Sequence, residues 1–99
     1  MISDEANQHL RLIENVIATN LLAGVNENSK GTFIWLEQRF DELVTLWDGN
    51  PYMLHQLVIL DTWFSVCWPR IYEHDWYDAS VFLSEALQRI HTIKQELAN

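Results

Sequence analysis

Apolar residues recur every three or four positions along most of this chain, and this helical period limits its fold more than any other feature. Four such stretches follow one another, at residues 3–23, 32–47, 51–68 and 79–97, with glycine or proline between them. No segment favours a strand over a helix. Because 99 residues suffice for one core and not for two, the sequence predicts a single all-α domain over residues 1–99, an antiparallel four-helix bundle.

The ends of the first three helices are predicted from turn residues. Gly24 is expected to end the first helix, whose apolar face includes Leu22, and the polar segment Val25–Gly31 is expected to form a loop. Asn50 followed by Pro51 is typical of a helix start, because asparagine caps a helix and proline fits its first turn. The short connection there predicts that helices two and three are antiparallel.

The third helix is apolar around most of its circumference, with residues such as Val58 and Val66 beside the main stripe. A helix with this pattern is expected to be the central one. Pro69 is expected to end it, because a proline interrupts the helical hydrogen bonds. The segment Arg70–Asp78 is therefore predicted to be an acidic, aromatic loop before the last helix.

The charge balance indicates which partners the chain can bind. Fourteen acidic residues against six basic ones give a net charge of −8. This charge argues against direct binding to nucleic acid or to an anionic membrane, and favours a basic protein as partner. No apolar run reaches the ~20 residues of a membrane span, and the acidic N-terminus is unlike an export signal. With one cysteine, Cys67, the chain is expected to be cytoplasmic.

The sequence carries no motif of a known catalytic or cofactor site. The three glycines are isolated, so no phosphate loop is formed, and no two of the four histidines have the i, i+4 spacing of a helical metal site. We therefore expect no enzyme activity, no metal and no cofactor. A small enzyme or metal-dependent sensor built on His55, His74 or Cys67 is the alternative from this class. Cys67 lies in an apolar run, which favours a buried structural role.

Acidic and large aromatic residues coincide in one part of the chain. Residues 37–78 hold eight acidic residues and two basic ones, together with four of the five tryptophans and all three tyrosines. Most of these aromatics can be core residues surrounded by solvated acids. Core packing explains the aromatics between residues 70 and 78 less well, because a loop offers no helical face to bury them.

We therefore interpret this acidic, aromatic part as a protein interface, in which charge speeds association and aromatic side chains hold the partner. The predicted aromatic anchors are Tyr72, Trp76 and Tyr77. The acidic residues predicted to attract the partner are Glu73, Asp75, Asp78, Glu37, Asp41 and Glu42.

In its length, acidity, helical pattern and acidic aromatic segment 72–78, the chain resembles the small helical immunity proteins of bacterial colicin-type and contact-dependent toxin systems. The resemblance implies a stoichiometric inhibitor of a basic toxin nuclease, whose carboxylates lie where substrate phosphates would bind. Phage-encoded inhibitors of nucleic-acid-binding defence complexes are similar for the same electrostatic reason. A self-associating helical adaptor is a further alternative, and the free protein is expected to be a monomer or a weak dimer.

Overall fold

The computed structural model describes residues 4–47, 49–73 and 75–98, and within these ranges the side chains of residues 67, 68, 70–72, 97 and 98 lie outside the description. The elements are α1 (Asp4–Ala23), the short 3-10 helix η1 (Glu27–Ser29), α2 (Lys30–Leu46), α3 (Pro51–Tyr72) and α4 (Trp76–Ala98). The predicted side-chain roles of Cys67 and Tyr72 and the sensor role of His74 therefore concern positions outside the described residues.

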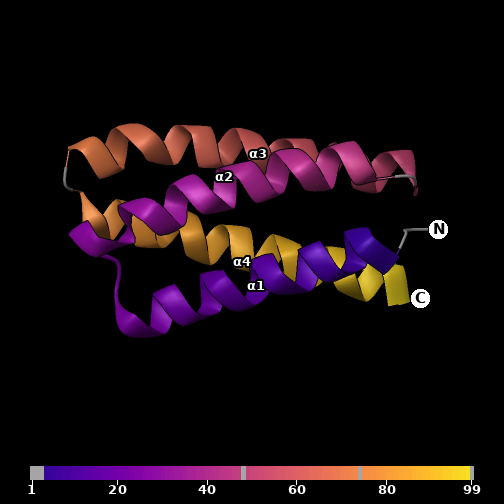
Figure 1. Cartoon of the computed structure of the whole chain (residues 1–99), viewed down its shortest axis with the longest axis horizontal. Coiled ribbons are helices and arrows are strands. Elements are labelled where there is room, and N and C mark those ends of the chain that lie inside the picture. Colours follow the sequence, from indigo (N-terminus) through magenta and orange to yellow (C-terminus); the bar gives the residue numbers. More distant parts are fainter. Residues whose placement is uncertain (1–3, 48, 74, 99) are drawn as a thin grey trace.

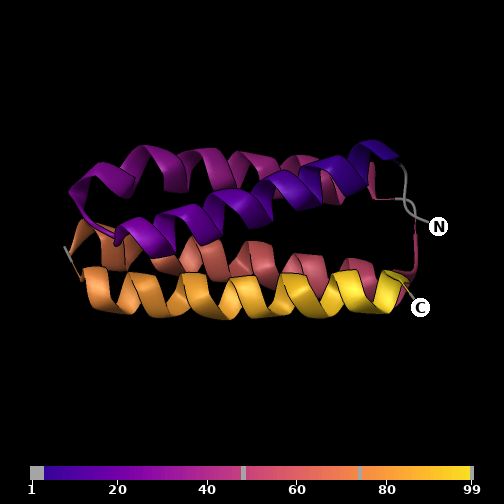
Figure 2. The same cartoon turned by 90° about the horizontal axis from the view of Figure 1, so that it is seen from below.

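The four α-helices lie side by side along the long axis of a body that measures 39 × 21 × 18 Å (Figures 1 and 2). Each helix runs antiparallel to the next one in the chain, and both termini lie at the same end. Contacts join α1 to α2, α2 to α3, α3 to α4 and α4 back to α1. The predicted all-α antiparallel four-helix bundle is confirmed.

Several predicted helix ends are confirmed by backbone geometry. Gly24 follows α1 with φ +91°, a left-handed conformation that glycine adopts without strain. At the start of α3, the Asn50 side chain accepts a hydrogen bond from the Tyr52 N–H (2.7 Å), and its carbonyl accepts one from the Leu54 N–H (3.1 Å). The expected loop Val25–Gly31 is shorter, because η1 and the first residues of α2 occupy most of it.

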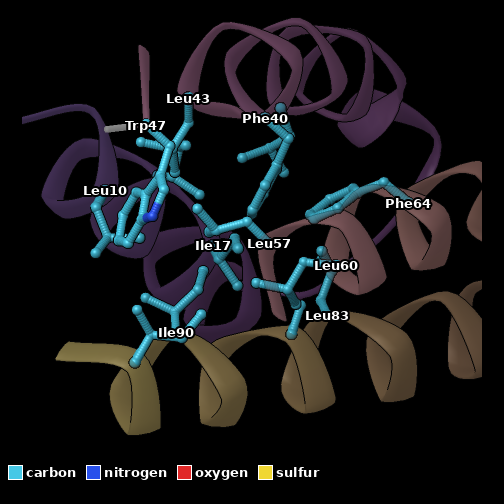
Figure 3. Close-up of a cluster of buried hydrophobic side chains, with 14 of the residues drawn as sticks. Leu10, Ile17, Phe40, Leu43, Trp47, Leu57, Leu60, Phe64, Leu83 and Ile90 are labelled. Carbon is cyan, nitrogen blue, oxygen red and sulfur yellow. The ribbon is translucent and has the colours of Figure 1, made fainter. Parts of the chain in front are cut away.

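The core is built from one apolar stripe on each α-helix, and Figure 3 shows these side chains pointing toward one another. Among the described side chains, the buried hydrophobic ones are Ala6, Leu10, Ile13, Ile17, Phe33, Leu36, Phe40, Leu43, Trp47, Met53, Leu57, Leu60, Phe64, Ala79, Leu83, Ala86, Ile90 and Ile93. Leu22, predicted on the apolar face of α1, is 91% exposed and does not join them.

The prediction that the third helix is the central one is wrong. In a closed bundle each helix buries only the stripe that faces the axis, and α3 buries Met53, Leu57, Leu60 and Phe64. Among the other described side chains of α3, Leu54 packs partly buried against the core and further apolar ones face outward. Val58 is 45% exposed and Val66 is 46% exposed, so α3 carries apolar side chains on its outer surface.

The predicted loop Arg70–Asp78 is mostly helical. α3 continues through Pro69 to Tyr72, and α4 begins at Trp76, so residues 73–75 connect them. Pro69 removes one helical hydrogen bond, but it lies at an exposed position near the helix end, where water can replace the lost bond. Its carbonyl accepts a hydrogen bond from the Glu73 N–H at 3.0 Å, which continues the helical turn.

Candidate functional site

The acidic residues predicted to bind a partner lie in two separate regions. Glu37, Asp41 and Glu42 are on α2, and the remaining ones are at the junction of α3 and α4. Asp61 of α3, which interacts with Asp41, is twelve residues from Glu73, about 18 Å along a helix. The structure therefore does not gather them into one cluster.

Carboxyl groups of α2 and α3 are crowded together between the two helices. The side chains of Asp41 and Asp61 share a hydrogen bond, and Glu37 lies near enough to act on Asp61 electrostatically. Partial burial, the hydrogen bond that protonated Asp61 donates to Asp41, and the charges of Asp41 and Glu37 raise the pKa of Asp61 to about 6. Asp41 and Asp61 are arranged to share one proton, because two negative charges at this separation repel each other.

On the other side of α2 a groove of about 370 Å³ separates it from α1. Its lining residues are Glu5, His9, Asp41, Glu42, Thr45 and Leu46. His9 Nε2 is 3.9 Å from a carboxylate oxygen of Glu42, and His9 Nδ1 is buried without a hydrogen-bond partner. The groove therefore combines three carboxylates with an apolar floor.

We define the acidic face as Glu5, Glu37, Asp41, Glu42 and Asp61. Asp41 joins its two halves, because it lines the groove and also contacts Asp61.

A basic side chain of this surface is already paired. The Arg39 Nη1 group donates to the Glu42 carboxylate at 2.9 Å, and its guanidinium lies 5.3 Å from the centre of the Trp35 ring. By contrast, Glu14 on α1 meets two basic groups of α4, Lys94 Nζ at 2.9 Å and His91 Nε2 at 3.3 Å. Glu14, on the α1–α4 side, is thus balanced locally, whereas the acidic face carries an excess of negative charge.

The second predicted region, residues 72–78, has a different character. Asp75 caps α4: its carboxylate accepts a hydrogen bond from the Asp78 N–H at 3.1 Å, and its carbonyl accepts one from the Ala79 N–H at 3.0 Å. Trp76 packs partly buried against the core, whereas Tyr77 is 77% exposed. Of the predicted anchors with a described side chain, Tyr77 is therefore the one available at the surface.

Two residues of the acidic face, Glu5 and Asp61, were not selected from the sequence, and neither was His9, which lies beside Glu5 in the groove. Asp61 had a recognisable feature, because it is the one Asp, Glu, Lys or Arg between Pro51 and Pro69. A lone carboxylate in such an apolar helix indicates a special environment.

A second cavity of about 280 Å³ lies between α3 and α4. Arg89 crosses it to donate to the Gln56 side chain at 2.8 Å, and its guanidinium lies 5.1 Å from the Trp63 ring centre. Glu85 and Glu96 also line this cavity, so its charges are mixed. Within residues 4–47, 49–73 and 75–98, no three His, Cys, Asp or Glu side chains are grouped to hold a metal ion.

Among the described helices, none combines the length and the apolar content that crossing a membrane requires. Comparison of the chain with protein-family models, curated proteins and solved structures finds no match. The function is therefore inferred from the chemistry of this chain's own surfaces.

Proposed function

We propose that this protein is a non-enzymatic inhibitor that binds a basic nucleic-acid-handling protein through its acidic face, with a toxin nuclease as the target. In this role it would act as an immunity protein in the cytoplasm of a bacterium. The observation that carries the proposal is the crowding of carboxylates around Asp41, with Asp61 on one side and the α1–α2 groove on the other.

Crowded carboxylates are costly in the free protein and become favourable when a cation arrives. Burial and the neighbouring Asp41 and Glu37 oppose the charge of Asp61 and raise its pKa to about 6. A lysine or arginine from a partner would relieve this repulsion. The resulting binding energy would not be available to a neutral or acidic partner, so the arrangement favours basic proteins.

The lining of the groove between α1 and α2 offers both kinds of contact that a basic side chain makes. Leu46 and Thr45 offer apolar contact to the aliphatic stem of a lysine or arginine, while Glu5, Asp41 and Glu42 surround the charged end. Nucleases carry such basic side chains where they hold substrate phosphates. Occupying these side chains with carboxylates would block substrate binding without any catalytic step.

The first experiment is capture of partners from the native cell with the tagged protein, washed in parallel at about 50 mM and about 500 mM salt. We expect one basic protein in equal amount with the bait, held more strongly at the lower salt. The identity of this protein distinguishes a nuclease toxin from a nucleic-acid-binding defence complex. Capture that does not depend on salt, or an acidic partner, would contradict the proposal.

A matched pair of double variants tests whether the acidic face is the partner-binding site. Asp41→Asn with Glu42→Gln removes two charges from the acidic face, whereas Glu85→Gln with Glu96→Gln removes two from α4. Because the net charge of both variants is the same, a specific site predicts unequal effects. We expect the first pair to slow association roughly tenfold at low salt and the second to change it less than about twofold. Equal effects would exclude the acidic face as the binding site.

A further inference from the structure

The outer surface of α3 differs from the acidic face and has no part in the proposed function. We propose that a second copy of this chain docks on this surface, with the two α3 helices antiparallel and a twofold axis at Thr62. We call this surface the α3 outer face; its exposed residues are Tyr52, His55, Val58, Thr62, Ser65, Val66 and Pro69.

The α3 outer face is free of formally charged residues. Between Pro51 and Pro69 every side chain described as exposed is apolar, a hydroxyl-bearing residue or His55. Asp61, the one Asp, Glu, Lys or Arg in this span, lies on the flank that meets α2. The outer surfaces of α1, α2 and α4 each carry charges, for example Arg11, Asp41 and Glu85.

This absence of charge favours a second copy over a basic partner. Two copies of a chain with a net charge of −8 repel each other, and this repulsion is smallest where neither surface adds a local charge. A basic partner, in contrast, is attracted to the carboxylates of the acidic face and finds no opposite charge on α3. The α3 outer face is therefore electrostatically suited to its own copy.

The spacing of its residues is also self-complementary. Val58 and Val66 stand four residues before and four residues after Thr62, in one row along the helix. If a second α3 crosses antiparallel at Thr62, Val58 of each copy meets Val66 of the other, and the two Thr62 residues meet at the axis. A twofold interface requires this kind of reciprocal pairing.

The two hydroxyl groups near the centre of the face do not prevent its burial. The Thr62 hydroxyl donates to the Val58 carbonyl at 3.0 Å, and the Ser65 hydroxyl donates to the Asp61 carbonyl at 3.4 Å. Both hydroxyl donors are thus already used within α3. Covering Thr62 and Ser65 with a second copy leaves neither hydroxyl donor without a partner, which would otherwise oppose association.

The apolar surface is not confined to α3. α4 extends the apolar area beside α3, because Trp63 of α3 packs edge to face on Phe82 at 6.4 Å. Half-exposed Val81 lies next to Phe82, one turn before Glu85 in the row of α4 that faces α3.

The test is the molecular mass of the purified protein by sedimentation, from about 1 µM to about 200 µM, at about 100 mM and about 500 mM salt. We expect a monomer–dimer equilibrium that salt shifts toward the dimer, because salt screens the repulsion between the copies. Binding of a basic partner has the opposite salt dependence, so a failure of one proposal is distinguishable from a failure of the other. A monomer at the highest concentration in both salts would overturn the inference.

Three variants locate the interface with equal charge changes. Val58→Glu and Val66→Glu place a carboxylate on the α3 outer face, and Ile34→Glu places one on α2 at a residue of matching exposure, 48%. We expect the first two to raise the dimer dissociation constant at least tenfold and the third to change it less than about twofold. All three positions are half-exposed, and circular dichroism verifies that each variant keeps its helices. Equal weakening by Ile34→Glu would refute the α3 outer face.

The register is tested by cross-linking. In a Cys67→Ser background, Thr62→Cys is expected to form a disulfide-linked dimer under mild oxidation, because the two Thr62 positions meet at the axis. Ile34→Cys in the same background is the control and is expected to stay monomeric. A dimer that Val58→Glu disrupts but that Thr62→Cys does not cross-link would overturn the antiparallel arrangement.

Discussion

The acidic face and the α3 outer face are both surfaces of helices that rest on the same core, yet they differ in nearly every chemical respect. Around Asp41 several carboxylates are close enough to raise the pKa of Asp61 to about 6. Along α3, from Tyr52 to Pro69, the exposed side chains carry no Asp, Glu, Lys or Arg. Helices with the same apolar period on their buried side can therefore carry a charged outer surface on α2 and an uncharged one on the neighbouring α3.

Asp61 marks the border between these two surfaces. It belongs to α3 but interacts with Asp41 and Glu37 of α2, so its charge contributes to the acidic face and not to the outer surface of its own helix. Association through the two surfaces is expected to respond differently to salt concentration. It should weaken association driven by the carboxylates and strengthen association between two copies of the chain.

The largest expected effect comes from the core that supports both surfaces. Phe40 of α2 is fully buried, and its ring centre is 4.6 Å from that of Phe64 of α3. Phe40→Ala should lower the free energy of unfolding by about 3–5 kcal/mol, because it leaves a cavity between the helices that carry the two surfaces. Urea unfolding measures this loss, with Leu12→Ala on the half-exposed surface of α1 as a control of small effect.

If the two surfaces depend on one core, Phe40→Ala should reduce partner binding and self-association together. Loss of one with full retention of the other would show that the two surfaces fold independently.

The fold was predictable because its information is local and periodic. One stripe on each helix, together with Gly24 and the Asn50–Pro51 start, determines four helices and their order. The length of α3 was not predictable in the same way. Pro69 usually indicates an end, and its tolerance here depends on its exposed position near the last turn, which is a property of the packed bundle.

The next largest expected effect concerns Asp75. Its carboxylate caps a helix, whereas the carboxylates of the acidic face are proposed to bind a partner. Asp75→Ala removes the hydrogen bond to the Asp78 N–H at the start of α4 and should cost about 1 kcal/mol of stability. Asp75→Asn keeps an acceptor and should recover most of this loss while it removes the charge. Thermal unfolding of both variants measures the difference. If the two lose equal stability, the role of Asp75 is electrostatic and not that of a cap.

The candidate site could be predicted only in part. The acids of α2 were visible as the polar side of an amphipathic helix, and the sequence placed Glu37, Asp41 and Glu42 there. Their contact with Asp61 arises because antiparallel packing brings the middle of α3 beside them, and no local pattern encodes that neighbour. Trp76, predicted as a surface anchor, is partly buried, because the start of α4 turns its side chain toward the core.

A smaller effect tests the crowding of the acidic face through pH. The pKa of Asp61 rises from 3.8 to about 6 on folding, so the folded protein binds the proton more tightly than the unfolded chain. The free energy of unfolding should therefore fall as the pH rises through this range, by no more than about 1 kcal/mol after solvent screening. Asp61→Asn should remove this loss and be the more stable protein at neutral pH.

Urea unfolding from about pH 4 to about pH 7 measures this difference between the native chain and Asp61→Asn. Glu96→Gln, which removes a carboxylate from α4, serves as the control. If the free energies of unfolding of the native chain and of Asp61→Asn differ by the same amount at every pH in this range, the crowding of Asp61 by Asp41 and Glu37 is contradicted.

The smallest expected effect on stability concerns Arg39. Its replacement should change association with a basic partner without changing self-association, so it distinguishes the two surfaces. Arg39 pairs with Glu42 and lies over Trp35, at a partly exposed position. Arg39→Gln should cost about 0.5 kcal/mol or less, because exposed ion pairs contribute little. The same change removes a positive charge from the acidic face, so association with a basic partner at low salt should become severalfold faster. Self-association through α3 should not change, since Arg39 belongs to α2. Stopped-flow mixing and sedimentation measure the two quantities, and a slower association would show that Arg39 contacts the partner itself.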